Sequence, residues 1–179
     1  MTYEDLFLKE GHGLISAYIL GHLQIEFLLL KIVEAHSPSL RDFSHKLTHY
    51  KLVELVYGLQ LITPKQKAAL LEINKFRNKF AHDILFEPSV ADFVKLFSSA
   101  QNAFSDMTDG ISQGLSELEE LTVINENFEF TLSDMFSQVL YDLHQIYCDN
   151  GGDFWEFNEH QEKESNSANS ADAKSRAAD

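Results

Sequence analysis

Apolar positions recur along this chain at the three- and four-residue intervals typical of α-helices, and no strong period-two strand pattern appears. The pattern predicts an all-α bundle of about five helices, separated by breaks such as the Ser-Pro-Ser run at 37–39 and Pro88. An interruption of the fourth helix is expected near Gly110 or Gly114. The predicted helices span about 2–34, 40–57, 63–82, 89–121 and 132–148, and TVINENFEFTL at 122–132 is a loop or a short extended piece.

The third predicted helix has the clearest beginning. A proline follows Thr63, and Gln66 stands three residues after Thr63, which is the pattern of a capping box with proline at the first helical position. Ser89 and Asp92 indicate a capped start for the fourth helix as well. These short-range signals fix where two of the helices begin.

Composition indicates a folded domain followed by a tail. Hydrophobic residues make up 44% and charged residues 23% of the 179 residues, which is ordinary for a globular protein. No large apolar residue follows Phe157, so the last segment cannot bury enough surface to offset the cost of ordering it. We therefore expect one helical domain at 1–157 and a disordered acidic tail at 158–179.

The beginning of the chain gives an expectation about location. Residues 1–10 mix acidic and apolar side chains and lack the basic start and apolar core of a signal peptide. The most apolar stretch, 14–33, is interrupted by four polar residues, which favours a buried helix over a membrane span. The single cysteine, Cys148, excludes an internal disulfide. We expect a cytoplasmic protein with no membrane partner.

Charge is distributed unevenly. The net charge of -14 argues against a surface that coats nucleic acid broadly. Between Arg41 and Asp83, however, eight basic residues face four acidic ones, so that this window carries +4. Between Ile84 and Glu162 one basic residue, Lys95, stands against sixteen acidic ones. Any anionic partner is therefore expected on the side of the second and third predicted helices.

The third predicted helix divides into two faces on a wheel of about 100° per residue. Its apolar stripe faces the core and consists of Ala69, Ile73, Phe76 and Phe80. Lys75, Asn78 and His82 lie on the opposite side, with Asn78 and His82 four residues apart and so adjacent on the surface.

The long side chain of Arg77 lies between the two faces and can bend toward the polar one. Two interpretations fit this face. One is a solvated helix end, where cationic side chains are favoured by the helix dipole. The other is an Arg77, Asn78 and His82 site for a phosphate, in which arginine grips the anion and histidine moves a proton.

The stretch INKFRNKFAHD resembles the R-x4-H motif of the HEPN superfamily, with Arg77 and His82 matching its arginine and histidine and Asn78 matching the polar residue that often follows the arginine. The longer segment from Asp42 to Ser89 is similar to mannitol operon repressor-like proteins, which share a helix ending in RNKFAH. The resemblance implies a helical bundle that forms a homodimer, with the motif facing a cleft between subunits.

What the resemblance implies about function is a metal-independent endoribonuclease, a toxin or defence effector, with catalytic residues Arg77, Asn78 and His82. In that chemistry the histidine assists attack of a ribose 2′-hydroxyl on the neighbouring phosphate, and the arginine stabilises the developing charge. RNA or a nucleotide is then the ligand, and a protein partner or antitoxin is a further candidate. The alternative is a non-catalytic, mannitol repressor-like regulator that binds a nucleotide or a partner.

Other candidates are weaker. His45 and His49, four residues apart, have a spacing that can bind a metal, but no third ligand stands nearby in sequence, and two solvent-facing histidines are expected. Cys148 is expected to be a partly buried structural residue. The aromatic residues of the acidic segment at 153–162 either fold back onto the core or dock on a partner. No Gly-rich phosphate loop is present in the sequence, and we expect no cofactor and no metal.

Overall fold

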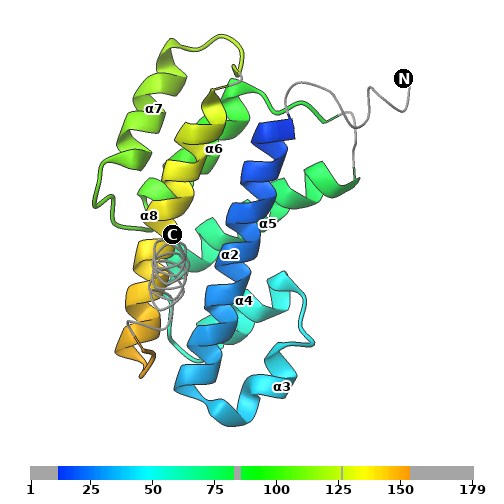
Figure 1. Cartoon of the computed structure of the whole chain (residues 1–179), viewed down its shortest axis with the longest axis vertical. Helices are drawn as coiled ribbons and strands as arrows, with labels where there is room; N and C mark the ends of the chain where they lie inside the picture. The colour runs from blue at the N-terminus through cyan, green and yellow to red at the C-terminus, as the bar shows by residue number, and fades with distance from the viewer. Residues whose placement is uncertain (1–11, 83–85, 126, 154–179) are drawn as a thin grey trace, which may run out of the picture.

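The computed structural model of this chain describes residues 12–82, 86–125 and 127–153. Within these ranges the regular structure is entirely helical, which confirms the predicted all-α class (Figure 1). The elements are α2 (His12–His36), η1 (Pro38–Leu40), α3 (Arg41–Ser44), α4 (His49–Gly58), α5 (Pro64–His82), α6 (Val90–Gln101), α7 (Gly110–Glu120) and α8 (Phe128–Asp149). The predicted tail at 158–179 and the aromatic segment around Trp155 lie outside the described residues.

The long helix α2 organises the bundle. It runs beside α8 over much of its length, and α6 and α7 pack on α8 at one end of the molecule (Figure 1). On its other side, α2 contacts α4 and α5, which also contact each other. The two groups of helices are joined where α5 packs on α6. The elements α2, α4 and α5 are those that position the candidate site.

The predicted second helix is wrong as one continuous element, because the chain forms η1, α3 and α4 in its place. The Ser44 hydroxyl donates to the carbonyl of Arg41 at 2.8 Å, a local bond that competes with helix continuation. Thr48 then adopts an extended conformation, with φ -71° and ψ 157°, and α4 begins at His49. The break turns the side chain of His49 into the interior, where a continuous helix need not have placed it.

The predicted fourth helix is two helices, α6 and α7, and the interruption falls at the predicted glycine, since α7 begins at Gly110. The Asp106 carboxylate accepts hydrogen bonds from the backbone N–H groups of Ile111 and Ser112 at 2.9 and 2.8 Å, which satisfies the open start of α7. The fifth helix begins at Phe128, earlier than predicted, because Phe128 is fully buried against Phe93.

The third predicted helix is confirmed as α5, and both predicted caps are confirmed with it. Thr63 N–H donates to Gln66 Oε1 at 2.8 Å, and Gln66 N–H donates to Thr63 Oγ1 at 3.2 Å. Ser89 and Asp92 form the same reciprocal pair at the start of α6. The apolar stripe of α5 lies in the core as predicted, with Phe80 only partly buried at its edge.

Aromatic rings join α2, α5, α6 and α8 in the core. Tyr18 is fully buried, stacks on Phe76 with ring centroids 5.2 Å apart, and meets the edge of Phe136 at 5.2 Å. Its hydroxyl donates to the carbonyl of Ile73 at 2.9 Å, so the polar end of the ring is satisfied. Phe76 also contacts Phe93 on α6. These contacts fix α2 against α5 beside the site described next.

Helix α2 also presents an exposed apolar face. Over residues 13–36 it is long and apolar enough to cross a membrane by length and composition, a test that the core helix of a soluble protein also passes. In the bundle it buries one side, yet Leu20, Leu23 and Phe27 remain 58%, 52% and 47% exposed. Because these three residues are spaced by three and four, they form one stripe, which we call the α2 stripe.

Candidate functional site

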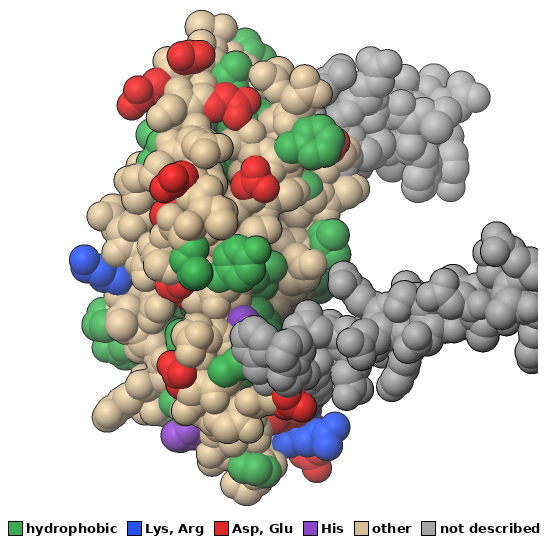
Figure 2. Space-filling model, turned by 60° about the vertical axis from the view of Figure 1, so that its left-hand side comes forward, with side chains coloured by type: hydrophobic (Ala, Val, Ile, Leu, Met, Phe, Trp, Pro, Cys, Tyr) green, Lys and Arg blue, Asp and Glu red, His purple; other side chains and the backbone are tan. Residues whose placement is uncertain are grey.

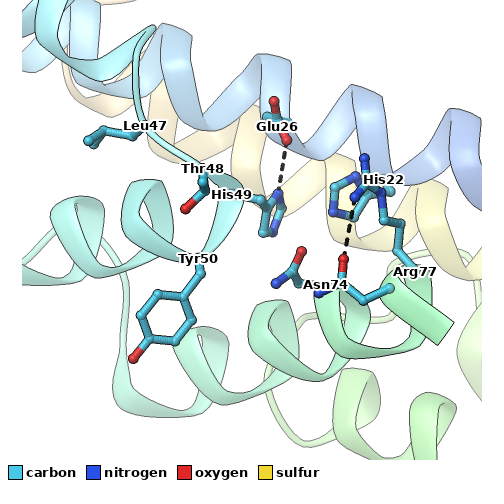
Figure 3. Close-up of a pocket in the computed structure, with 9 residues that line it drawn as sticks. His22, Glu26, Leu47, Thr48, His49, Tyr50, Asn74 and Arg77 are labelled. Carbon is cyan, nitrogen blue, oxygen red and sulfur yellow. Dashed lines mark hydrogen bonds and ion pairs between the residues drawn. The ribbon is translucent and has the colours of Figure 1, made fainter. Parts of the chain in front are cut away.

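A cavity of about 410 Å³ lies where α2, the start of α4 and the second half of α5 meet (Figure 3). Its lining is mostly polar, and histidine, carboxylate, amide and guanidinium groups face one space. The lining residues are His22, Glu26, Leu47, Thr48, His49, Tyr50, Asn74, Arg77 and Asn78. The cavity therefore brings together titratable and amide side chains from three helices.

Two of the three residues predicted for a phosphate site line this cavity together. Arg77 and Asn78 are partly buried, and Arg77 Nη1 donates to Asn78 Oδ1 at 3.3 Å. This bond holds the guanidinium toward the polar side of α5, as the helical wheel predicted. His82 is exposed and is not part of the cavity lining, so the structure does not bring it into the same enclosed space.

Two histidines form the buried wall of the cavity. His22 and His49 are 1% and 6% exposed, and their rings are tilted by 33° to each other with centroids 4.2 Å apart (Figure 3). Among the described residues, their four ring nitrogens are the buried side-chain nitrogen and oxygen atoms without a well-aligned hydrogen bond. Asn74 is the polar neighbour of the His22 ring on the side of α5 (Figure 3).

The expectation that His45 and His49 both face solvent is wrong for His49. Its side chain is buried, and its Nδ1 lies 3.4 Å from Glu26 Oε2. His45 does face solvent, and its Nε2 lies 2.8 Å from Glu34 Oε1 outside the cavity. One continuous helix would have placed the two histidines on the same face. Because α3 ends at Ser44 and α4 begins at His49, their side chains point in different directions.

Burial controls the protonation of the histidine pair. Burial is the largest cause that lowers the pKa of His22 to about 4; the positive charge of Arg77 acts in the same direction, and Asn74 opposes the shift. Burial also lowers the pKa of His49 to about 3, with His22 and Arg77 acting in the same direction and the Leu70 carbonyl against it. Both imidazoles are therefore neutral at pH 7, and each offers a lone pair on a ring nitrogen.

Sequence reasoning missed His22 and Asn74, and it considered His49 only as a metal ligand paired with His45. His22 and Glu26 stand four apart on α2, a spacing that places both side chains on one face. In sequence they read only as polar interruptions of an apolar helix. The four-residue spacing of His22 and Glu26 is the signal that could have identified them. Its meaning becomes clear only when α4 is known to begin at His49, which places that histidine beside them.

The remaining candidates lie outside the cavity. Cys148 is partly buried, as expected, with its Sγ 3.9 Å from His144 Nε2. Burial raises the pKa of the Cys148 thiol, with the nearby charges of Asp149 and Asp153 adding to this. A raised thiol pKa disfavours the thiolate, so Cys148 is a poor nucleophile at neutral pH.

The arrangement can do two kinds of chemistry. The guanidinium of Arg77, the amides of Asn74 and Asn78 and the first turn of α4 offer hydrogen-bond donors to an anion. The imidazoles and the Glu26 carboxylate offer lone pairs.

Comparisons with protein-family models, curated proteins and solved structures find no match to this chain.

Proposed function

We propose that this chain is an RNA-acting protein of the HEPN type, a metal-independent endoribonuclease in which Arg77 and Asn78 hold the phosphate and His82 transfers a proton. The observation that carries the proposal is the placement of Arg77 and Asn78, joined by a hydrogen bond, in a polar cavity. Arginine binds a phosphate bidentately and stays charged throughout a reaction. A toxin or defence role fits such an activity.

The basic side of the chain supports an anionic ligand at this place. The window from Arg41 to Asp83 carries +4 although the whole chain carries -14, and the cavity lies on α4 and α5 within it. Acidic side chains are instead spread over the face on the side of α7 and α8, with few basic ones among them (Figure 2). A polyanion is therefore repelled by one side of the bundle and admitted on the other.

In the proposed reaction the 2′-oxygen of a ribose attacks the adjacent phosphorus, and the bond from phosphorus to the 5′-oxygen breaks. His82 accepts the proton of the 2′-hydroxyl, and the departing 5′-oxygen takes a proton from water. A 2′,3′-cyclic phosphate and a 5′-hydroxyl are the products. Because His82 lies one helical turn beyond Asn78, about 5 to 6 Å along α5, the RNA must extend along this helix.

A homodimer is part of the proposal. The α2 stripe offers an apolar surface that a second copy would cover, and two-fold pairing is the commonest arrangement of such surfaces. Two copies would present two Arg77 and His82 sites to one RNA.

The test is an incubation of the full chain with mixed RNA in EDTA. Wild-type protein should cleave, and the products should carry a cyclic phosphate. Arg77→Ala should lose phosphate binding, and His82→Ala should keep binding but lose cleavage. Lys75→Ala is the matched control, because Lys75 is an exposed cation on the same helix and outside the cavity. Cleavage by His82→Ala at the wild-type rate would refute the catalytic role.

A second candidate function is a non-catalytic regulator that binds a nucleotide or a partner with the same cavity. The observation that favours it is the position of His82 outside the cavity lining, away from Asn74 and the histidine pair. In that case RNA stays intact with every variant, whereas Arg77→Ala weakens binding of a nucleotide measured by equilibrium titration. Lys75→Ala again leaves the binding constant unchanged.

A further inference from the structure

Two imidazoles and one carboxylate converge at the buried wall of the cavity. One ring nitrogen from each of His22 and His49 and one oxygen of Glu26 all lie within 4.8 Å of one another. His22 and Glu26 come from one face of α2, and His49 comes from the first position of α4. Three donors from two helices therefore surround one point (Figure 3).

The buried histidine pair lowers the stability of the fold unless its ring nitrogens have hydrogen-bond partners or a ligand. A buried polar group without a partner costs about 1 to 3 kcal/mol, and native proteins keep few of them. Here the ring nitrogens of two residues that touch each other have polar neighbours, namely Glu26, Asn74 and the Leu70 carbonyl, but no well-formed hydrogen bond. A ligand that accepts the lone pairs of both rings would remove part of this cost at once.

We propose that His22, Glu26 and His49 bind a divalent transition-metal ion, with Zn²⁺ as the ion that fits, and leave a fourth coordination position open to the cavity. Neutral imidazole with one carboxylate is a ligand set that suits zinc and its neighbours in the first transition row. Magnesium and calcium prefer oxygen ligands throughout, which this set does not provide. The proposal goes beyond the ribonuclease, whose chemistry requires no metal.

The spacing of the donors suits this ion. Zinc bonds of about 2.0 to 2.1 Å in a tetrahedron separate the ligand atoms by roughly 3.4 Å. Glu26 Oε2 and His49 Nδ1 already lie 3.4 Å apart. The third donor, on His22, lies within 4.8 Å of the other two, so it needs to move by no more than about 1.4 Å to reach that separation. The His22 ring can supply this movement by turning, because no well-formed hydrogen bond holds it.

The charges define what occupies the open position. The two neutral histidines bring no charge and Glu26 brings one negative charge, so a bound Zn²⁺ leaves the site with a charge of about +1. The Arg77 guanidinium, also in the cavity, adds a further positive charge. A cation beside an arginine is favoured when an anion lies between them. The fourth ligand is therefore expected to be an anionic oxygen, as in phosphate or hydroxide.

Titration of the EDTA-stripped and dialysed full-length chain with zinc chloride tests the site, read by calorimetry and by thermal unfolding. Wild-type protein should bind one Zn²⁺ per chain and unfold at higher temperature when it is bound. His49→Gln and Glu26→Gln should each weaken binding by about 100-fold or more, beyond the loss seen for groups that only orient ligands. An excess of Mg²⁺ should not displace the zinc.

The matched control is His45→Gln, since His45 is an exposed histidine four residues before His49 and outside the cavity. It should bind zinc as wild type does. Equal affinity of wild type and His49→Gln would overturn the proposal, and so would a loss of binding in His45→Gln. Because RNA cleavage is measured in EDTA, failure of the metal site and failure of the ribonuclease are separate results.

A second measurement decides the matter if a variant does not fold. Wild-type protein loaded with Co²⁺ should show two strongly shifted histidine ring resonances in the proton NMR spectrum. The same spectrum with added inorganic phosphate should change if an anion takes the fourth position. A cobalt-loaded wild-type protein with no shifted histidine resonance would overturn the site.

Discussion

At the scale of single residues, the neutral imidazoles of His22 and His49 determine how the metal-free protein responds to acid. Both rings have a pKa far below that of a histidine in an unfolded chain, which is about 6.5. Between pH 6.5 and about 4 the unfolded chain therefore binds protons that the folded chain does not. As the pH is lowered through this window, the free energy of unfolding should therefore decrease, by up to about 1.4 kcal/mol per pH unit for each histidine.

Urea unfolding in EDTA at several pH values checks this first prediction. The decrease should be present in wild type and absent in the double variant His22→Gln/His49→Gln, which has no group titrating there. Above pH 6.5 the two proteins should respond to pH alike, because both histidines are neutral in both states. A double variant that keeps the full decrease would show that other groups cause it.

The site illustrates which residues a sequence can identify. Arg77 and Asn78 were predicted to share a polar face, because their helix has a clear start and a regular stripe that fix its rotation. His22 and His49 could not be predicted, because they meet only after the chain breaks at 45–48 and α4 packs on α2. His22 and His49 are 27 residues apart in the sequence, and the local pattern of apolar positions does not indicate a contact over that distance.

At the scale of elements, the contact between α2 and α8 depends on a residue without a side chain. Gly21 is buried in α2, and a Cβ added there would overlap the ring of Phe136 on α8. The ring is itself 2% exposed and has little room to move. Gly21→Ala should therefore lower the free energy of unfolding by about 1 to 3 kcal/mol through overpacking. Thermal and urea unfolding measure the change.

Gly58→Ala is the control for this second prediction. Gly58 ends α4 and has no atom within 4 Å of an added Cβ. Alanine there should be neutral or stabilise by up to about 1 kcal/mol, because it favours the helix and restricts the unfolded chain. Equal effects of the two substitutions would show that the clash with Phe136 is relieved at no cost.

The start of α5 gives a third prediction. Thr63→Ala removes the hydroxyl that accepts the Gln66 N–H at 3.2 Å, and should cost about 1 kcal/mol. Lys65→Ala, an exposed change in the same first turn, should change stability by less than about 0.5 kcal/mol. Chemical unfolding of both variants checks the difference, and an equal loss of stability in Lys65→Ala would show that the effect is not specific to the cap.

Caps and breaks differ in how far sequence can predict them. The capping boxes at Thr63 and Ser89 follow from four neighbouring residues, and both are present. The division of the predicted second helix, and the early start of α8, depend on Ser44 and on the burial of Phe128 against another helix. At such helix boundaries a local conformational preference competes with contacts to residues far away in the sequence. Periodicity alone therefore does not predict where the helix begins or ends.

At the scale of the whole molecule, the proposed dimer gives a fourth prediction. Leu23→Glu places a charge at the centre of the α2 stripe, where a second copy would have to desolvate it. Wild type should elute as a dimer in size-exclusion chromatography with light scattering, and Leu23→Glu as a monomer. Val94→Glu, the same kind of change at a 36% exposed residue of α6, should stay dimeric. A monomeric wild type at high concentration would refute the dimer.

The cytoplasmic location and the partners stay predictions. The charge pattern bears on which partners each side of the molecule can attract. The basic window and the cavity coincide, whereas the face on the side of α7 and α8 is acidic (Figure 2). The charge pattern favours a basic partner on the acidic side, and the proposed RNA on the other side. One chain could therefore meet two partners of opposite charge without competition.

The ring cluster around Tyr18 has a consequence for spectroscopy. The core rings that join α2, α5, α6 and α8 are phenylalanines and one tyrosine, and the single tryptophan of the chain, Trp155, lies outside the described residues. The described ring cluster therefore contains no indole. Near-ultraviolet circular dichroism from the packed Tyr18 is the optical signal that follows the loss of the bundle itself.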